Sequence, residues 1–346
     1  MSLRGPVAAL MALAVTLSPA AAKAKALGAE GIPAFSHVVV VVLENESAST
    51  TWGSGSVAHY INSLVPRGVF ASQYYATGHV SLDNYIAMVS GQPASPLTGS
   101  DCAAVSLWIC VQGQQLYSSG RNLADQLEAK GLTWKEYADG TPTPCFHGPY
   151  SPTSLSPDPY QGDSQKPPAK DYADRHNPFI YFKNIIENQT RCAAHVRPFT
   201  DLASDIGTNT LPAFSFITPD TCHDGHDAPC SNGQPGGLVS ADKWFSQNIP
   251  ALLDYLWAHN GLLVITSDES SVSDLSGCCS GGLLGLLPGF GGRVGLLALS
   301  KKLTPGRTVA TKYDHMSLLR TIEDSFGITE YLNNAARAAP MTDVLR

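Results

Sequence analysis

The chain has 346 residues, of which 43% are hydrophobic and 15% charged, so it can bury a large core without requiring several domains. Its formal net charge of −7 argues against binding of polyanions through bulk charge. We expect no nucleic-acid partner, because no basic stripe interleaved with aromatic residues is present.

The first 24 residues have the order of a secretory signal peptide: Arg4, then the apolar stretch Val7–Leu17, then small residues. Residues 25–346 are then expected to form one exported domain, secreted or periplasmic. No other apolar run reaches the ~20 residues that a membrane span requires. The sequence therefore predicts no stable membrane insertion, and it leaves the oligomeric state open.

Four apolar runs rich in β-branched residues predict strands: His37–Leu43, Ala213–Thr218, Leu262–Ser267 and Arg293–Ser300. Their hydrophobicity is continuous, which is typical of strands covered on both faces in a mostly parallel sheet. Helical patterns alternate with them: Ser81–Gly91, Asn122–Gly131, Lys243–Gly261 and Asp314–Gly327. This alternation predicts an α/β fold, a three-layer α/β/α sandwich around a mostly parallel central sheet.

Two stretches do not fit the alternation. Pro142–Lys170 is rich in proline, serine and aspartate, which predicts a loop-rich insertion around residues 140–175. Gly277–Gly292 is rich in glycine and leucine and follows an acid pair, so it is either a flexible lid near a site or a plain loop.

All eight cysteines lie after the signal peptide, and an even count in an exported chain favours disulfides over zinc–thiolate sites. Neighbours in the sequence suggest Cys102 with Cys110 and Cys222 with Cys230, which leaves Cys145 with Cys192 by elimination. Cys278 and Cys279 are adjacent, and a bridge between neighbours is strained, so the sequence does not fix the connectivity.

Acidic and amide side chains follow two of the predicted strands. Glu44 and Asn45 end the first, and Asp268 and Glu269 end the third. Ligands of open α/β sheets bind outside the carboxyl ends of the strands, and adjacent acids in one crevice repel each other unless a cation lies between them. The pattern predicts a cation site at this edge of the sheet.

Ser81 opens a predicted helix directly after Gly78 and His79. A serine at this position is ordinarily a helix cap. A helix amino terminus also concentrates N–H groups, which suits a phosphoryl group beside a nucleophilic hydroxyl. Asn84, one turn on, lies on the same side and is a candidate oxyanion donor, whereas Asp83 beside a phosphate is unfavourable unless it faces a cation.

The segment Pro219–Cys230 follows another strand and is crowded with potential ligands, namely Asp220, His223, Asp224, His226 and Asp227. Any one aspartate here is explained by turn chemistry, but an Asp-x-His pair within a disulfide loop is a credible metal site. His315 begins a later helix, and alone it is more often a structural residue. Acids, a serine and histidines at strand ends are together typical of metal-assisted phosphoryl transfer.

Six blocks in order carry a resemblance to a known family: "HVVVVVLEN", "GHVSLDNYIAMVSG", "RHNPFIYF", "CHDGHDAPC", "ITSDE" and "DHMSLLRTIED". They resemble the bacterial phosphoesterase family of the alkaline phosphatase superfamily, which includes secreted acid phosphatases and non-specific phospholipases C. The likeness is greater to the branch of acid phosphatases and phosphatidylinositol-3-phosphatases. The resemblance implies an alkaline phosphatase-like fold.

The resemblance also implies roles. It makes Ser81 the nucleophile that forms a phosphoserine intermediate, and it gives the cation beside that serine to Glu44, Asn45, Asp268 and Glu269. A second cluster of Asp224, His226 and His315 would either bind another metal or contact the phosphate and protonate the leaving group. Further expected phosphate or substrate contacts are His79, Asn84 and His176.

The expected cofactor is one or two divalent ions, Mg, Ca or Zn, and the long acids at Glu44 and Glu269 favour Mg²⁺ or Ca²⁺ over Zn²⁺. The leading hypothesis is a secreted metal-dependent phosphomonoesterase, acid phosphatase-like, acting on a small phosphorylated substrate or a phospholipid head group such as a phosphoinositide. One alternative is a phospholipase C-type phosphodiesterase with a wide apolar mouth at Gly281–Phe290. The alternative from another class is an inactive exported protein that binds metal or phosphate, with Ser81 only capping its helix.

Overall fold

The computed structural model describes residues 29–101, 110–113, 119–148, 171–279 and 289–346. The predicted signal peptide, most of the predicted insertion, the centre of the glycine-leucine segment and Cys102 lie outside these residues. None of the helices in the described ranges is both long and apolar enough to cross a membrane.

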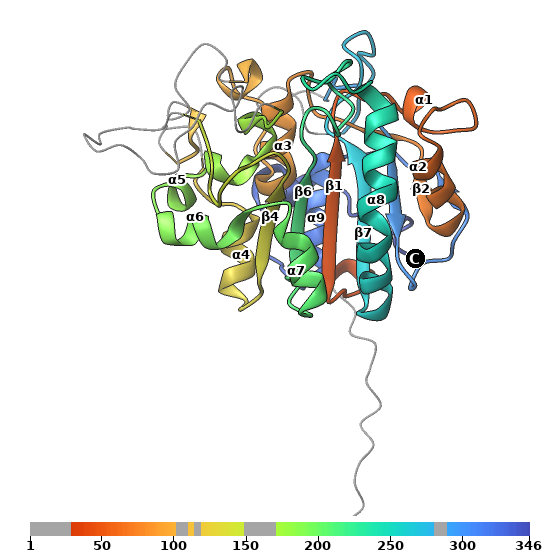
Figure 1. Cartoon of the computed structure of the whole chain (residues 1–346). Helices are drawn as coiled ribbons and strands as arrows, with labels where there is room; N and C mark the ends of the chain where they lie inside the picture. The colour runs from red at the N-terminus through yellow and green to blue at the C-terminus, as the bar shows by residue number, and fades with distance from the viewer. Residues whose placement is uncertain (1–28, 102–109, 114–118, 149–170, 280–288) are drawn as a thin grey trace, which may run out of the picture.

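An eight-stranded sheet forms the centre of the protein (Figure 1). Its spatial order is β5 (Val196–Pro198), β4 (Trp134–Ala138), β6 (Phe214–Thr218), β1 (His37–Leu43), β7 (Gly261–Ser267), β8 (Leu296–Leu299), β2 (Val69–Ala71) and β9 (Arg307–Val309). All neighbouring pairs are parallel except those of β8, which runs antiparallel to both β7 and β2. A separate parallel pair joins β3 (Tyr74–Tyr75) to β10 (Tyr313–Asp314). The predicted mostly parallel sheet is confirmed.

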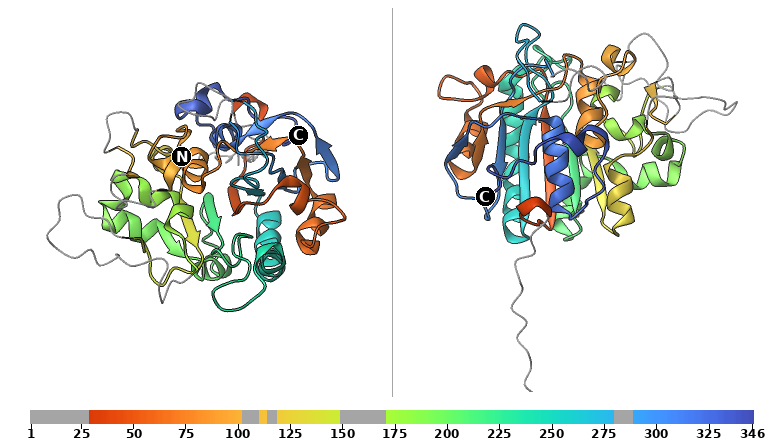
Figure 2. Two further views of the ribbon diagram at one scale, coloured as in Figure 1. Left: turned by 90° about the horizontal axis from the view of Figure 1, so that it is seen from above. Right: turned by 180° about the vertical axis from the view of Figure 1, so that it is seen from behind.

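Helices cover both faces of this sheet, as the views from above and from behind show (Figure 2). One face packs against α3 (Ser81–Ser90), α4 (Leu123–Ala129) and α9 (His315–Ser325), and the other against α2 (His59–Leu64), α7 (Asp201–Gly207) and α8 (Gly237–Ala258). Three short helices, α1 (Ala48–Thr51), α5 (Lys183–Ile186) and α6 (Gln189–His195), complete the described set. This is the three-layer α/β/α arrangement expected from the sequence.

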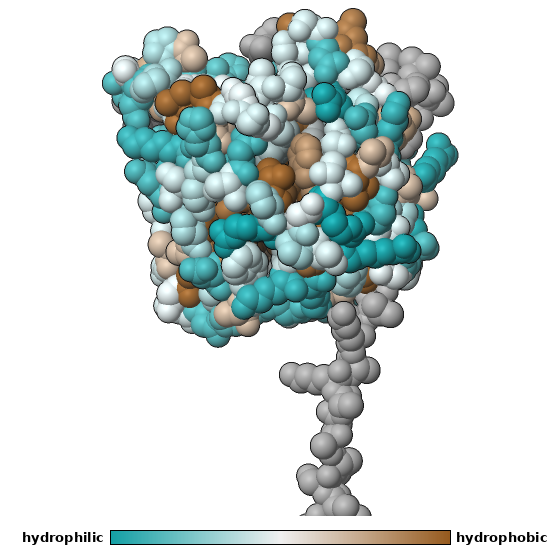
Figure 3. Space-filling view, turned by 90° about the vertical axis from the view of Figure 1, so that its right-hand side faces the viewer, coloured by the Kyte–Doolittle hydropathy of each residue, from teal (hydrophilic) through white to brown (hydrophobic). Residues whose placement is uncertain are grey.

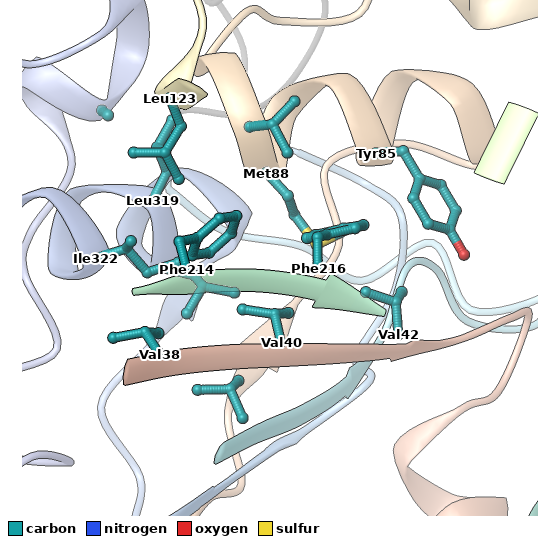
Figure 4. Close-up of a cluster of buried hydrophobic side chains, with 14 of the residues drawn as sticks. Val38, Val40, Val42, Tyr85, Met88, Leu123, Phe214, Phe216, Leu319 and Ile322 are labelled. Atoms are coloured by element: carbon teal, nitrogen blue, oxygen red, sulfur yellow. The ribbon is translucent and has the colours of Figure 1, made fainter. Parts of the chain in front are cut away.

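The five valines of β1 explain why this strand lies at the centre. All five are fully buried, and alternate residues belong to opposite cores. Val38, Val40 and Val42 pack with Phe214, Phe216 and residues of α3 and α9 (Figure 4), while Val39 and Val41 pack with α8. Each buried valine contributes roughly 1.5 kcal/mol or more of hydrophobic free energy, so β1 is a firm support for whatever follows it.

The predicted elements are all present, with shifted limits. The run Arg293–Ser300 contributes only Leu296–Leu299 to the sheet, and α8 begins at Gly237, six residues before the expected Lys243. Strands β2, β4, β5 and β9 were not expected from the sequence, because three of them have only three residues and β4 carries Lys135 and Glu136.

Three disulfides lie in the described residues: Cys145–Cys192, Cys222–Cys230 and Cys278–Cys279. The first two agree with the pairings suggested by the sequence, and the third is the bridge between neighbours that the sequence left open. The proposed partner of Cys110 lies outside the described residues. On the face that carries α1 and α2, hydrophilic residues cover most of the surface and hydrophobic residues form small separate patches (Figure 3).

Candidate active site

The ends of β1 and β7 bring two predicted segments together at the upper edge of the sheet in Figure 1. The two strands are parallel, with Leu43 opposite Ser267, so Glu44 and Asp268 follow at neighbouring positions. The Asp268 N–H donates to the Leu43 carbonyl (2.9 Å), and the Asn45 N–H donates to Asp268 Oδ1 (3.2 Å). Asn45 has a positive φ of 55°, so the chain turns away directly after Glu44.

Glu44, Asp268 and Glu269 form a buried carboxylate cluster. One oxygen from each lies within 4.8 Å of the others, and none of the three residues is more than 4% exposed. Asp268 Oδ2 has no hydrogen-bond partner among the described residues. Burial, followed by the charges of Glu44 and Glu269, raises the pKa of Asp268 well above its ordinary value. An orphaned carboxylate oxygen among buried acids fits a divalent cation, and an all-oxygen set suits a hard ion such as Mg²⁺ or Ca²⁺.

Ser81 is the first residue of α3 and points at this cluster. Its Oγ donates to Glu44 Oε1 at 2.5 Å, and its side chain is buried. The residue at the helix cap is Val80, which makes no side-chain cap hydrogen bond, and the Leu82 N–H is accepted instead by Asp101 Oδ1 (2.9 Å). The serine hydroxyl therefore donates to the acid cluster and does not cap its own helix.

Asn84 supports the loop before Ser81. Its Oδ1 accepts from the N–H groups of Thr77 (2.8 Å) and Gly78 (3.1 Å), and its Nδ2 donates to the Gly78 and Val80 carbonyls. A Cβ at Gly78 would lie 2.6 Å from an oxygen of Asp83, so a larger residue here would require the Asp83 side chain to move. In this arrangement Asn84 fixes the loop, because its side-chain hydrogen bonds are directed there and not at an oxyanion as expected from the sequence.

His79 and Glu269 form a pair beside the cluster. His79 Nδ1 lies 3.2 Å from Glu269 Oε2, and its Nε2 lies 2.9 Å from the Asp274 carbonyl. The Glu269 hydrogen bond is the main cause that raises the pKa of His79, and burial raises the pKa of Glu269 to about 7. Both ring nitrogens face acceptors, and an imidazole can donate from both nitrogens only when it is protonated. The contacts of His79 therefore match a protonated ring.

His176 lies between two carboxylates on the far side of Glu44. Its Nε2 is 3.2 Å from Glu44 Oε2 and its Nδ1 is 3.3 Å from Asp224 Oδ2, while the ring stacks on Tyr85 at 5.1 Å. Burial alone lowers the pKa of His176, but the charge of Glu44 and the contact with Asp224 raise it to about 9. For Glu44, burial raises the pKa and the protonated His176 outweighs that effect, so the pKa falls to about 2.

The loop Pro219–Cys230 contributes Asp224 to the site and directs its histidines elsewhere. His226 is exposed and pairs with Asp227 (2.8 Å), and His223 pairs with Asp220 (2.7 Å) and Asp139 (3.2 Å). The potential ligand group of Asp220, Cys222 and His223 is incomplete, because Cys222 is bonded to Cys230. The His226 N–H donates to Asp224 Oδ1 (2.8 Å), but its imidazole ring faces Asp227 and does not join Asp224 as a second ligand.

His315 lies beneath the cluster. Its Nε2 is 2.5 Å from the Asp268 carbonyl and its Nδ1 is 2.9 Å from the Tyr74 hydroxyl. Burial lowers the pKa of His315 to about 4, so the ring is neutral and carries its proton on Nε2. It holds the backbone of Asp268 in place and does not join Asp224, in contrast to the second cluster expected from the sequence.

Most of the predicted residues thus meet: Glu44, Asn45, His79, Ser81, His176, Asp224, Asp268 and Glu269. Three further residues border them without having been predicted, namely Tyr85, whose hydroxyl is 3.4 Å from Glu44 Oε2, and Arg175 with Asp101. Tyr85 and Arg175 belong to quoted sequence blocks and were identifiable from their neighbours Asn84 and His176. No signal in the sequence indicated Asp101.

Comparison with known proteins finds a family model and relatives that match most of the chain. A model of the Phosphoesterase family matches residues 54–329. A probable acid phosphatase from Kluyveromyces lactis is 28% identical over 297 residues, which are 85% of this chain and 59% of the relative. A phosphatidylinositol-3-phosphatase from Mycobacterium tuberculosis is 27% identical over 322 residues, 92% of this chain and 85% of the relative. The chain is thus similar to the second relative over most of both lengths, and it spans little more than half of the first.

Solved structures support the fold. An alkaline phosphatase superfamily protein from Vibrio parahaemolyticus superposes with a TM-score of 0.54 at 13% identity, covering 87% of this chain and 69% of the other. A phosphonate monoester hydrolase from Silicibacter pomeroyi gives 0.53 at 12% identity, covering 90% and 76%. The alkaline phosphatase-like fold expected from the sequence is confirmed.

Proposed function

The chain belongs to the Phosphoesterase family, and we propose that it is a phosphoric ester hydrolase that removes phosphate from monoesters through Ser81. The observation that carries this proposal is the 2.5 Å hydrogen bond from Ser81 Oγ to Glu44, at the start of α3 and against the carboxylate cluster. A nucleophilic hydroxyl beside an acceptor and a cation site is the arrangement that phosphoryl transfer to serine requires.

Ser81 attacks phosphorus as the bond to the leaving alcohol breaks, and water then releases phosphate from the phosphoserine. Glu44 directs the hydroxyl, since Oε1 accepts its hydrogen bond while Oε2 faces His176. The amino terminus of α3 presents positive dipole to the phosphoryl oxygens. His79 is kept near the same place by Glu269 and Asp274.

A divalent cation is part of the proposal. Glu44, Asn45, Asp268 and Glu269 are the residues that would hold it, and the unpartnered Asp268 Oδ2 supports this assignment. A bound divalent ion would acidify the serine hydroxyl and offset the charge of the phosphate. Glu44, His176 and Asp224 form a second buried group whose ligand atoms could hold an ion, so the proposal covers one or two divalent ions.

We further propose that the protein is exported. The signal-peptide pattern in residues 1–24 supports export, as do the disulfides, which persist in oxidising compartments. Fractionation of the source cells, with detection of the processed chain outside the cytoplasm, tests this point. Detection of the full-length chain in the cytoplasm would contradict it.

The activity is tested with an aryl phosphate monoester and the matching aryl phosphocholine diester, with and without EDTA. We expect monoester turnover by the wild type, its loss in Ser81→Ala, and its loss on chelation. Asp227→Asn is the matched control, because Asp227 lies on the same edge outside the carboxylate cluster. Turnover that persists in Ser81→Ala would overturn the role of Ser81, and preferred turnover of the diester would favour a phosphodiesterase.

A further inference from the structure

Arg175 is a partly buried cation at the margin of the site. It lies in the short turn Asp174–His176, which packs on α3, and its side chain is 24% exposed. The nearest acidic group is Asp101, with 3.8 Å between Arg175 Nε and Asp101 Oδ2, which is too long for a hydrogen bond. The same Asp101 accepts the Leu82 N–H through its other oxygen, so Arg175 is linked to the first turn of α3 beside Ser81.

The guanidinium group has five N–H donors in a planar fork, and in the part of the chain that the structure describes none of them makes a hydrogen bond. Other arginines of the protein are used differently. Arg191, for example, donates to Asp125, Glu128 and the Asn184 carbonyl. No guanidinium nitrogen of Arg175 is among the buried polar atoms of the described residues that lack a partner, so its free donors are accessible to a ligand. The planar fork of the group matches phosphate oxygens in a bidentate manner.

The other cationic groups of the site lie closer to carboxylates than Arg175 does. His176 contacts Glu44 and Asp224, and His79 contacts Glu269 and the Asp274 carbonyl. Arg175 is close enough to Glu44 and Asp224 for their charges to favour its protonated form, after the opposing effect of burial. Among the described residues of the site, it is the permanent cation that remains available to a substrate.

We propose that Arg175 binds the non-bridging oxygens of the substrate phosphate and selects the dianionic group of a monoester over the singly charged group of a diester. This inference rests on the proposed function and adds a residue that sets its specificity. Both esters offer the two terminal oxygens that a bidentate contact uses, but the monoester dianion carries twice the negative charge and therefore gains more from the guanidinium group. Asp101 positions the arginine and simultaneously fixes the start of α3.

The test compares Arg175→Ala and Arg175→Lys with the wild type on the monoester and diester pair. Loss of one charge-assisted contact predicts a rise in KM for the monoester of roughly 10- to 100-fold in Arg175→Ala, with a smaller change in kcat. For the diester the rise is expected to be below about 5-fold, so the selectivity ratio falls by about an order of magnitude. Lysine keeps the charge without the fork and should recover only part of the loss, whereas added guanidinium ion should rescue the alanine variant.

A binding measurement separates this inference from the proposed reaction. Calorimetric titration of inorganic phosphate into Ser81→Ala, which needs no turnover, should show binding that weakens at least about 10-fold in Ser81→Ala/Arg175→Ala. Arg121→Ala, at an exposed arginine outside the site, is the control and should bind phosphate like its parent. Unchanged phosphate affinity in the double variant, or equal losses on monoester and diester, would overturn the assignment. Absence of Ser81-dependent turnover in the wild type would instead overturn the proposed function.

Discussion

The two carboxylate oxygens of Glu44 face different residues of the site. Oε1 accepts from Ser81 and Oε2 faces His176, so one side chain links the nucleophile to the buried histidine. Its position is set by β1, whose five buried valines leave little freedom at the strand end. Glu44 is therefore oriented before a substrate arrives, which is what electrostatic preorganisation requires.

The cluster of acids around Asp268 predicts that removing one charge raises the stability of the metal-free protein and weakens its metal binding. Replacing Asp268 by Asn keeps an oxygen for the N–H groups of Asn45 and Glu269 and removes one of three mutually repelling charges. We expect Asp268→Asn to be more stable than the wild type in EDTA by an amount on the order of 1 kcal/mol. The stabilisation of the wild type by millimolar Mg²⁺ or Mn²⁺ should be absent in the variant.

Thermal unfolding with and without each metal measures both effects. Asp227→Asn is the matched control, because Asp227 pairs with His226 outside the cluster and should leave the metal response unchanged. A variant less stable than the wild type in EDTA would show that the three acids are not in mutual repulsion. A variant that retains the full metal response would remove Asp268 from the cation site.

At this scale the sequence predicts which residues meet better than it predicts where their side chains point. Glu44 and Asp268 follow apolar strands, and parallel pairing brings any such residues together. Asn84 and His315 were placed correctly near the site, but local partners turn them to the loop before Ser81 and to the Asp268 backbone. Those partners depend on backbone detail that residue spacing does not encode.

Helix α9 carries a buried acid that makes stability depend on pH. Glu323 is fully buried, its Oε1 accepts from Gln126 Nε2 (2.9 Å) and the Leu332 N–H (2.9 Å), and its Oε2 has no partner among the described residues. Burial raises the pKa of Glu323 from 4.5 to about 7. The folded state therefore prefers the protonated form, and this contribution to stability is lost as the pH rises from 4.5 through 7.

Glu323→Gln should remove this loss, because glutamine is neutral and keeps the accepting oxygen. The unfolding free energy of Glu323→Gln minus that of the wild type should be larger at pH 8 than at pH 4, by on the order of 2 kcal/mol. Urea titrations at both pH values provide the measurement. Glu330→Gln, at an exposed glutamate, should show no such difference, and equal pH profiles for Glu323→Gln and the wild type would contradict the raised pKa.

Among the elements, the long apolar strands were predictable from the sequence, and the strands that combine apolar and charged residues were not. Strands β1, β6 and β7 are continuous hydrophobic runs, whereas β4 places Glu136 in a buried position that hydropathy alone assigns to the surface. The direction of β8 could not be predicted from the sequence either, because an apolar run is equally compatible with parallel and antiparallel pairing. Tertiary pairing decided both cases.

For the molecule as a whole, two disulfides span very different lengths of chain. Cys145–Cys192 closes a separation of 47 residues and Cys222–Cys230 one of 8. The chain-entropy relation gives about 4 kcal/mol for the first and about 2.6 kcal/mol for the second. We expect Cys145→Ser/Cys192→Ser to lose more unfolding free energy than Cys222→Ser/Cys230→Ser.

The second pair should matter more for activity, since its loop carries Asp224. Denaturant unfolding and monoester kinetics on both double variants measure the two effects separately. Equal stability losses would indicate that native contacts, and not loop closure, govern the contribution. Unchanged kinetics in Cys222→Ser/Cys230→Ser would show that other contacts suffice to place Asp224.

The reversed strand β8 has a consequence for how this fold can diversify. Because β8 runs against β7, the segment between Ser267 and Leu296 leaves the sheet and returns to it at the same edge, the edge of Ser81. Insertions or deletions there would alter the chain beside His79, which contacts the Asp274 carbonyl, while every strand keeps its register. Exchanging this one segment between homologues is thus a route to new substrate preferences without rebuilding the scaffold.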